Sequence, residues 1–322
     1  MMTRFVAALS LALVVVAPAE AADKVRLGNL KFAHYGAVSF MKDHCGRFGL
    51  DVDEIVFPKG IDIFPAIVRG EVDIAASAAD AAIANRAGGG QIYVVAGFAK
   101  GGARLVAQAG LPIRTVADLK GRKVGVARGG AQELLLLAEL AKAGLTWADR
   151  PGKDVQIVYL PFADLNQALL QKQVDAMCQS EPQSSQAINK GFGVEMLKPY
   201  DTPLGEPVRV LVMTERLYRE KPDVALRVLK CFVDATRTFI NDPVLARRYV
   251  VEQMFKGQIT AQDYDDALSN AAFTYDVTAD HIQVTTDLMT RYGVGKMTRP
   301  PRAADWVKLD LLRKAKAELG VK

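Results

Sequence analysis

The chain has 322 residues, of which 50% are hydrophobic and 24% charged, and its formal net charge is +5. This length suits two domains of average size rather than one small core, and the composition is that of a globular protein. The positive excess is mild and contains no basic block, which argues against nucleic acid or another polymer as a partner.

The N-terminus has the pattern of a cleaved signal peptide. Arg4 supplies a positive charge, the stretch 5–17 is nearly all apolar, and Ala19-Glu20-Ala21 has the small-x-small form of a cleavage site. The apolar run is shorter than the ~20 residues that span a bilayer, which disfavours a membrane anchor. No cysteine follows the cleavage site, so no lipid attachment is indicated. We therefore predict removal of residues 1–21 and a soluble exported protein that starts near Ala22.

The chain has three cysteines, Cys45, Cys178 and Cys231, without CxxC spacing. An exported protein could pair two of them, but the sequence leaves the pair open. The three histidines do not combine with these cysteines into a zinc pattern. We expect no metal site and no cofactor.

The first part of the mature chain alternates between strand and helix patterns, and Gly88-Gly89-Gly90 ends one of the helices. The expected elements are strand 25–30, a polar-aromatic loop 31–36, helix 38–48, strand 52–57, helix 62–69, a short strand ending before Ser77, helix 79–87, strand 92–96, a glycine-bearing loop 98–102 and strand 104–108.

Two stretches about a hundred residues apart share one pattern, in which a strand, a proline turn and an amphipathic helix precede a short buried strand opened by Val-Asp. The first covers 56–75 and the second 159–177. Each is a βαβ unit of a parallel sheet, and the repetition predicts two similar lobes. Ligands bind at the carboxyl ends of parallel strands, so two facing lobes would clamp a ligand in a cleft.

A second unit begins near residue 115, and the chain after residue 214 is helical in pattern. The expected elements are strand 124–127, helix 131–143, the repeat to residue 180, a short helix after Glu181-Pro182, strand 208–213 and helices 215–240, 243–256, 260–271, 278–291 and 302–319. The helical tail needs a surface to pack on, so we expect the chain to return to the first lobe.

The predicted fold class is therefore α/β with two lobes, mainly parallel sheets, flanking helices and a helical C-terminal tail. Lobe one would contain residues 22–108 and 209–322, and lobe two residues 109–208. Two chain crossings would give two hinge strands, which allow the lobes to close as rigid bodies.

The order of these motifs resembles ABC-transporter substrate-binding proteins of the nitrate/sulfonate/taurine/thiamine-precursor type, which have a type II periplasmic binding fold. The likeness covers essentially the whole mature chain. The motifs that carry it are the export signal, Val72-Asp73-Ile74-Ala75, the stretch 118–126, Val174-Asp175-Ala176, Glu181-Pro182 and Ala303-Ala304-Asp305-Trp306.

The resemblance implies a monomer that captures a small solute and delivers it to an ABC permease in the inner membrane. It does not identify the solute, because this branch serves sulfonates, nitrate, bicarbonate, pyrimidines and aromatic acids. The expected function is capture of a small organic anion or heterocycle by hinge closure.

Lobe one offers candidate ligand contacts in loops that follow strands. His34 and Tyr35 lie in the first loop, where the resembling family places pocket residues. Ser77 follows the first Val-Asp strand, although its spacing to Asp80 also fits helix capping. We add Phe98 as a stacking wall and Lys100 as a positive charge.

In lobe two, Arg128-Gly129-Gly130 precedes a predicted helix. The glycines let the backbone approach a ligand, the helix start favours an anion, and Arg128 could make a forked contact with it. Phe162 is a second possible wall, and Gln179 aligns with Ser77 in the repeat. Glu181 would repel an anion unless Arg128 or a ligand amine paired with it, which favours an organic ligand over an inorganic anion.

Two other functions fit the same fold. An enzyme of the desulfinase or pyrimidine-synthesis type would use Cys178 as nucleophile. We expect no enzyme, because the cysteine-rich signature of the pyrimidine synthases is absent and a buried cysteine is commonly a small apolar filler. A sensor subunit would present the same closed clamp to a membrane receptor instead of a permease.

Overall fold

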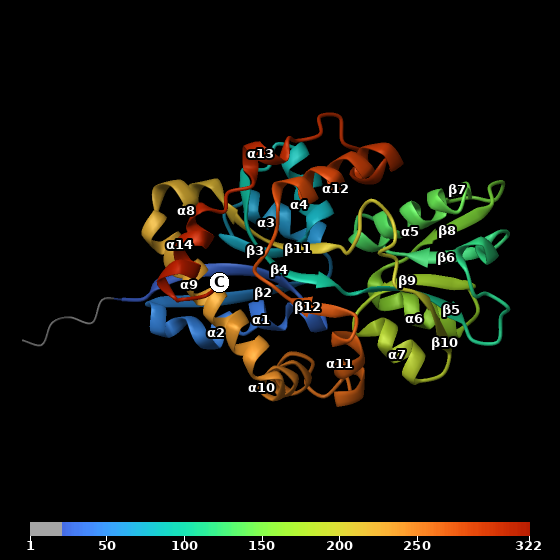
Figure 1. The fold of residues 1–322 in the computed structure, drawn as a ribbon, viewed down its shortest axis with the longest axis horizontal. Coiled ribbons are helices and arrows are strands. Elements are labelled where there is room, and N and C mark those ends of the chain that lie inside the picture. The colour runs from blue at the N-terminus through green and yellow to red at the C-terminus, as the bar shows by residue number, and fades with distance from the viewer. Residues whose placement is uncertain (1–20) are drawn as a thin grey trace, which may run out of the picture.

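The computed structural model describes residues 21–322, so the predicted signal peptide lies outside the described residues except for Ala21. In this part of the chain the strands form two six-stranded sheets, one in each of two lobes (Figure 1). Lobe one contains, in sheet order, β12 (Ala271–Phe273), β4 (Ile92–Gly101), β11 (Val208–Thr214), β3 (Ile74–Ala78), β1 (Asp23–Leu30) and β2 (Leu50–Phe57). Lobe two contains β10 (Gly193–Leu197), β5 (Ala103–Gln108), β9 (Ala176–Ser180), β6 (Lys123–Val126), β8 (Val155–Tyr159) and β7 (Trp147–Ala148).

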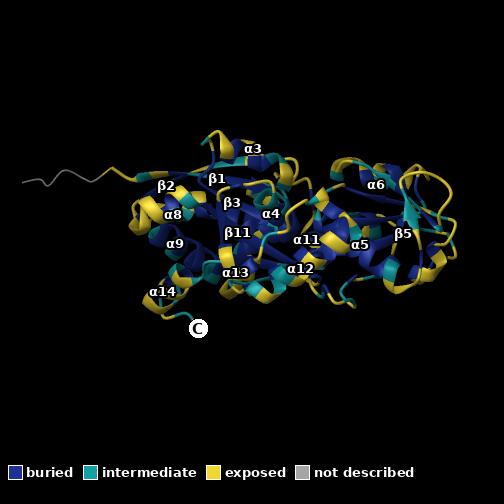
Figure 2. Cartoon of the chain, turned by 90° about the horizontal axis from the view of Figure 1, so that it is seen from above, coloured by how far each residue is buried: buried dark blue, intermediate teal, exposed yellow. Residues whose placement is uncertain are grey.

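Helices cover both sheets, and burial is concentrated where they pack on the strands (Figure 2). Lobe two carries η4 (Val116–Leu119), α5 (Ala131–Lys142), α6 (Phe162–Leu170) and α7 (Gln183–Asn189). Lobe one begins with η1 (Ala33–Tyr35), α1 (Gly36–Ser39), α2 (Met41–His44), η2 (Cys45–Phe48), η3 (Gly60–Asp62), α3 (Ile63–Val68) and α4 (Ala79–Ala87). Its C-terminal part adds α8 (Glu215–Glu220), α9 (Pro222–Asn241), α10 (Pro243–Arg248), η5 (Tyr249–Met254), α11 (Ala261–Leu268), α12 (Ala279–Tyr292), η6 (Val294–Lys296), α13 (Ala303–Trp306) and α14 (Asp310–Glu318).

The two lobes repeat one strand arrangement. In lobe one β1 pairs in parallel with β2 and β3, and in lobe two β6 pairs in parallel with β8 and β9. The predicted parallel cores are therefore present, and antiparallel strands extend each sheet on one side, namely β11, β4 and β12 in lobe one and β5 and β10 in lobe two. The chain crosses between the lobes where these antiparallel strands are joined, from β4 to β5 and from β10 to β11.

The Val-Asp motif has the same structural role in both lobes. The Asp73 amide donates to the Arg26 carbonyl at 2.9 Å, and the Arg26 amide donates to Asp73 Oδ2 at 3.1 Å. In lobe two, Asp175 and Lys123 make the same reciprocal pair at 2.8 Å in each direction. The aspartate thus ties the start of β3 to β1 in lobe one and the start of β9 to β6 in lobe two.

The first crossing lies earlier than the sequence predicted. β4 belongs to the lobe-one sheet, whereas β5 already pairs with β9 and β10 of lobe two. The chain changes sheets at Gly101 and Gly102, whose φ values of 75° and 80° favour glycine. The predicted boundary after residue 108 is therefore wrong, because the turn at Gly110 follows a strand that belongs to lobe two. The expected loop 98–102 is largely the end of β4.

The helical tail returns to lobe one. β11 joins the lobe-one sheet between β3 and β4, as expected for a return near residue 208. Trp306 is fully buried, and Val307 forms a bridge with Val94 of β4. None of the helices within residues 21–322 is long and apolar enough to span a bilayer.

The cysteine pair that the sequence left open is Cys45–Cys231, with Cα atoms 5.3 Å apart. The disulfide ties η2 to the long helix α9 within lobe one. Cys178 is buried in β9 as a free thiol.

Candidate functional site

A cleft runs between the lobes, and we divide it into an outer cleft and an inner pocket. The outer cleft has a volume of about 700 Å³. It is lined by apolar and aromatic side chains from both lobes together with the polar side chains of Lys31, Lys59, Asp62, Arg128, Gln183 and Gln258. The inner pocket has a volume of only about 20 Å³, which is enough for one water molecule.

Phe32 and Phe162 lie where the two spaces meet. Phe32 comes from lobe one and Phe162 from lobe two, and both line the outer cleft and the inner pocket. Their rings meet edge to face with centroids 5.3 Å apart. This contact joins the lobes and separates the inner pocket from the open end of the cleft.

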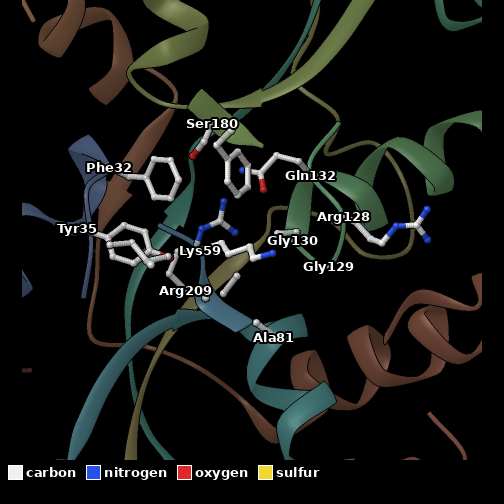
Figure 3. A pocket seen from close by; sticks show the side chains of 15 residues that line it. Phe32, Tyr35, Lys59, Ala81, Arg128, Gly129, Gly130, Gln132, Ser180 and Arg209 are labelled. Atoms are coloured by element: carbon white, nitrogen blue, oxygen red, sulfur yellow. The ribbon is translucent and has the colours of Figure 1, made fainter. Parts of the chain in front are cut away.

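Arg209 of β11 lies in the inner pocket (Figure 3). Its side chain is among the largest that are fully buried, and the residue is 2% exposed. Its Nε donates to His34 Nε2 at 3.3 Å, whereas Nη1 and Nη2 have no hydrogen-bond partner in the described chain. A buried charge lowers the stability of the fold unless it is paired, so we expect this guanidinium to bind an anionic partner.

His34 and Tyr35, two neighbours of Arg209, are uncharged, whereas the Asp80 carboxyl also lies within range of its charge. Burial lowers the pKa of His34 well below its usual range, and the charge of Arg209 lowers it further. Burial also raises the pKa of Tyr35, whose phenol therefore stays protonated. His34 is consequently neutral and accepts through Nε2, which leaves the two Nη groups of Arg209 as the strong donors of the pocket.

The lobe-two wall is built from the loop before α5. Glu133 accepts hydrogen bonds from the Gly129 amide and the Tyr159 hydroxyl, both at 2.7 Å. Gly129 has a φ of 74°, and a Cβ on Gly130 would lie 3.1 Å from the Phe162 ring. Glycines are thus needed for both the turn and the close approach. The Gly129 amide, which we expected to face an anion, is occupied by Glu133.

Arg128 lies at the rim rather than at the bottom of the cleft. Its guanidinium stacks on the Tyr159 ring at 3.6 Å and lies 3.7 Å from Asp149. Figure 3 shows its side chain turned away from the inner pocket. The buried arginine of the cleft is therefore Arg209, and a contact between Arg128 and a ligand stays a prediction.

Five of the predicted site residues do line the cleft: Tyr35, Arg128, Gly129, Gly130 and Phe162. His34 lies behind them and contacts Arg209. These residues come together because the loops after β1, β6 and β8 open at the same edge of their sheets, as the rule for parallel sheets predicts.

Three other predicted residues are buried beneath the cleft and do not line it. Ser77 donates to the Ala78 carbonyl at 3.1 Å and does not cap α4. Phe98 lies in β4 and packs on Tyr35 with centroids 4.7 Å apart. Gln179 donates to the Phe162 carbonyl at 3.0 Å and accepts from the Ser180 amide. The polar groups of Ser77 and Gln179 thus bond to the local backbone, and Phe98 belongs to the core.

Lys100 and Glu181 also lie outside the cleft lining. Lys100 is a residue of β4, not of a loop. Glu181 is fully buried and pairs with Arg104, Nε to Oε1 at 2.7 Å, and it accepts from the Ser185 hydroxyl. The expected pairing of Glu181 with Arg128 is wrong, because Arg104 of β5 reaches Glu181 across neighbouring strands.

The prediction missed Arg209, Phe32 and Gln132 as lining residues. A signal for Arg209 was present, because it is the one charged residue in the apolar strand 208–213. A charge inside such a run is unfavourable without a partner, which marks it as a candidate.

Comparison with known proteins identifies a family. The model of the NMT1-like family matches residues 18–255. An Escherichia coli K12 protein named for binding aliphatic sulfonates is 36% identical over 146 residues, 45% of this chain and 44% of that protein. A Brucella abortus protein named as a binding protein is 31% identical over 177 residues, 52% of each chain. The matches thus span about half the length of these relatives.

Solved structures share the fold over most of the chain. The ligand-binding component of an ABC-type import system from Staphylococcus aureus has a TM-score of 0.76 at 18% identity, covering 91% of this chain and 99% of that one. The Escherichia coli periplasmic aliphatic sulphonate binding protein SsuA has 0.74 at 21% identity, covering 89% and 92%. The Synechocystis nitrate-binding protein NrtA has 0.75 at 17% identity, covering 94% and 90%. The two-lobed periplasmic binding fold is thereby confirmed, and the chain belongs to the NMT1-like family.

Proposed function

We propose that this protein is the solute-binding component of an ABC importer and captures a small organic anion or heterocycle by closing its lobes. The observation that carries this proposal is Arg209, a buried guanidinium with two unpartnered Nη groups in the pocket between the lobes. Sulfonates, carboxylates and pyrimidine-like compounds are the candidate classes. The names of the sulfonate- and nitrate-binding relatives support an anionic ligand.

The surroundings of Arg209 favour an anion with an apolar body. A guanidinium can bind a carboxylate or sulfonate through two parallel hydrogen bonds, and burial strengthens them. Phe32, Tyr35 and Phe162 supply apolar faces around this point. The inner pocket of about 20 Å³ is too small for such a ligand, so entry requires the lobes to separate and the Phe32–Phe162 contact to open.

The proposal includes the location and the partner. Residues 1–21 have the pattern of a signal peptide, which supports export to the periplasm. A permease in the inner membrane would receive the solute from a monomeric receptor. The fold shared with a component of an ABC-type import system supports this partner.

We propose binding rather than catalysis. Cys178, the nucleophile that an enzyme would need, is fully buried in β9, and burial raises the pKa of its thiol. The thiolate is the reactive form of cysteine, so this thiol is poorly suited to attack a substrate.

A thermal-shift screen of the purified protein tests the proposal. The compounds are alkyl- and arylsulfonates, nitrate, bicarbonate, aromatic carboxylates and pyrimidines. A ligand at about a hundredfold excess over its Kd adds about 2.7 kcal/mol of stability, a readily visible shift. We expect one anionic class to raise Tm and to be recovered unchanged.

Variants of Arg209 identify the site. Arg209→Met should abolish the shift, Arg209→Lys should retain part of it, and Arg69→Met, at an exposed arginine paired with Glu71, should leave it unchanged. A shift of full size in Arg209→Met would remove Arg209 from the site. Conversion of the compound would replace the binding proposal by an enzyme.

A further inference from the structure

Asp80 is a buried carboxylate that the proposed binding contacts do not use. It is the second residue of α4 and is 2% exposed, and neither carboxylate oxygen has a hydrogen-bond partner within the described chain. The backbone N–H groups of Asp80 and Ala81 at the helix start lie close enough to favour its ionised form.

Asp80 faces a small cavity between the lobes. The cavity has a volume of about 10 Å³. Its lobe-one walls are Ala79, Asp80, Val208, His281 and Thr285, and it is closed by Ala131 and Leu134 of α5 and by Leu204 and Pro207 of the second crossing. Since α5 belongs to lobe two, separation of the lobes would admit water to this carboxylate.

Charged and titratable groups act on Asp80 from four elements. Arg209 of β11 favours its ionised form, whereas Glu133 of α5 disfavours it. Tyr35 of η1 is close enough for the Asp80 charge to raise its pKa. His281 of α12 faces the same cavity, and burial with the charge of Lys100 lowers its pKa, so it is neutral. Arg209 is therefore the one cation among them that favours ionised Asp80.

We infer that Asp80 takes up a proton from solvent when an anion binds Arg209 and the lobes close. This inference rests on the proposed anion site at Arg209. The anion cancels the positive potential that keeps Asp80 ionised, and closure removes water from its carboxylate; both changes favour the protonated form. The only bond formed is the O–H bond of Asp80. The anion thus replaces the aspartate as the counter-charge of Arg209, and the net charge of the closed site does not change.

This coupling makes anion binding dependent on pH. The anion-bound form holds the proton more tightly than the free form, so binding is strongest at low pH and weakens as the pH rises between the two pKa values. Burial raises the pKa of Asp80 in the ligand-free closed form to about 7, against the opposing charge of Arg209. The affinity for an anion that stays ionised should therefore fall across neutral pH, by at most about tenfold per pH unit.

The first test needs no ligand. The Asp80 carboxyl is titrated by carbon-13 NMR in wild type, Arg209→Met and Arg209→Lys, with Asp80→Asn to assign the signal. Loss of the Arg209 charge imitates its neutralisation by an anion, so the titration midpoint of Asp80 should move to higher pH in Arg209→Met. In Arg209→Lys the positive charge is kept, and the midpoint should stay near the wild-type value. Equal midpoints in wild type and Arg209→Met would overturn the inference.

The second test counts protons during binding of benzenesulfonate, which stays ionised throughout. Calorimetry in Tris and in imidazole at one pH gives the protons taken up per ligand. We expect uptake of up to one proton in wild type and in His281→Asn, and none in Asp80→Asn. Equal uptake in Asp80→Asn and wild type would overturn the inference while leaving the anion site intact. If benzenesulfonate does not bind, arylsulfonates are removed from the proposed ligands, and the ligand-free titration decides the role of Asp80.

Discussion

At the scale of single residues, the bottom of the cleft holds one permanent cation, Arg209, whose guanidinium has no hydrogen-bonded anion among the described residues. Arg209 cannot lose its proton, whereas His34 is neutral and Tyr35 keeps its phenol proton. Burial of a charge without a hydrogen-bonded counter-ion lowers stability, and strongly perturbed ionisable groups cluster at functional sites. Arg209 therefore costs the ligand-free fold stability that a bound anion would restore.

Stability should depend on pH through His34. Its pKa in the folded protein lies well below the value of about 6.5 in an unfolded chain, because of burial and the Arg209 charge. A depressed histidine pKa means that the unfolded state binds a proton more readily, so stability is full above pH 6.5 and falls as the pH drops towards the folded pKa. The free energy of unfolding should change by at most about 1.4 kcal/mol per pH unit through this one group.

Urea unfolding of wild type and His34→Gln between pH 5 and 8 tests this dependence. Glutamine can still accept from Arg209 Nε but does not titrate, so the stability difference between the two proteins should shrink as the pH falls below 6.5. The Asp80 contribution is common to both and cancels in the difference. Parallel pH profiles would show that His34 does not titrate on unfolding as proposed.

The residues that sequence reasoning placed correctly in the cleft lie just after strands. Tyr35, Gly129 and Phe162 follow strands, and the rule for parallel sheets locates such loops without knowledge of packing. Whether the side chains of Arg209 and Gln179 reach the pocket depends instead on the direction in which they point within their strands. One-residue alternation along a strand decides which side chain reaches the pocket, and the repeat alone could not show that Gln179 turns to the Phe162 carbonyl.

At the scale of elements, local patterns located most segments, merged α8 and α9 into one predicted helix 215–240, and missed three strands. Helix α4 was predicted with its observed bounds, because its apolar run is followed by glycines. Strands β7, β10 and β12 have two, five and three residues and exist by pairing with β8, β5 and β4. Such short pieces carry no periodicity of their own, so only the neighbouring strand reveals them.

The disulfide is the strongest covalent constraint within lobe one. Cys45 and Cys231 are 186 residues apart in sequence, and a link over a long loop restricts the unfolded chain strongly. Replacing both by alanine should lower the free energy of unfolding by about 2–5 kcal/mol. Each single variant should cost nearly as much as the double variant, because either one breaks the same bond.

Urea unfolding in the presence and absence of reductant measures this effect. Wild type should lose stability in reductant, whereas the Cys45→Ala/Cys231→Ala protein should be insensitive to it. Cys178→Ala serves as the matched control, since this thiol is free and its loss should add to that of the pair. Single variants that each cost half of the double variant would argue against the disulfide in the purified protein.

At the scale of the whole molecule, the repeat predicted two lobes but not where the chain passes between them. The crossing lies at Gly101-Gly102, beside His34 and Asn270, where a Cβ would meet these residues at 2.6 Å and 2.3 Å. The turn at Gly110, which also has a positive φ, gave a similar local signal. Only the pairing of β5 with β9 distinguishes a hinge from an ordinary turn.

A buried polar network lies beside this crossing and joins the lobes. Arg104 of β5 is 3% exposed and lies within ion-pair distance of Glu181, of Glu195 and of Asp266. Asn270, at the end of the α11 segment of lobe one, donates to Glu181 Oε1 at 3.0 Å. The network therefore ties α11 to lobe two at the hinge, whereas the Phe32–Phe162 contact lies between the outer cleft and the inner pocket. Opening of the lobes is expected to pivot about this network.

Variants of Arg104 and Glu181 test whether the network acts as a unit. Arg104→Met leaves the buried Glu181 carboxylate without its cation, and burial already raises the pKa of that group against the Arg104 charge. Removing one partner of a buried pair typically costs about 3–5 kcal/mol, whereas replacing both by apolar residues of similar size is often near neutral.

In urea unfolding at pH 7 we expect Arg104→Met to be strongly destabilised and Arg104→Met/Glu181→Leu to recover much of the loss. Arg247→Met, at an exposed arginine 3.0 Å from Asp265, is the matched control and should change stability by less than about 1 kcal/mol. Additive losses in the double variant would mean that the two residues stabilise the hinge independently, through their other partners.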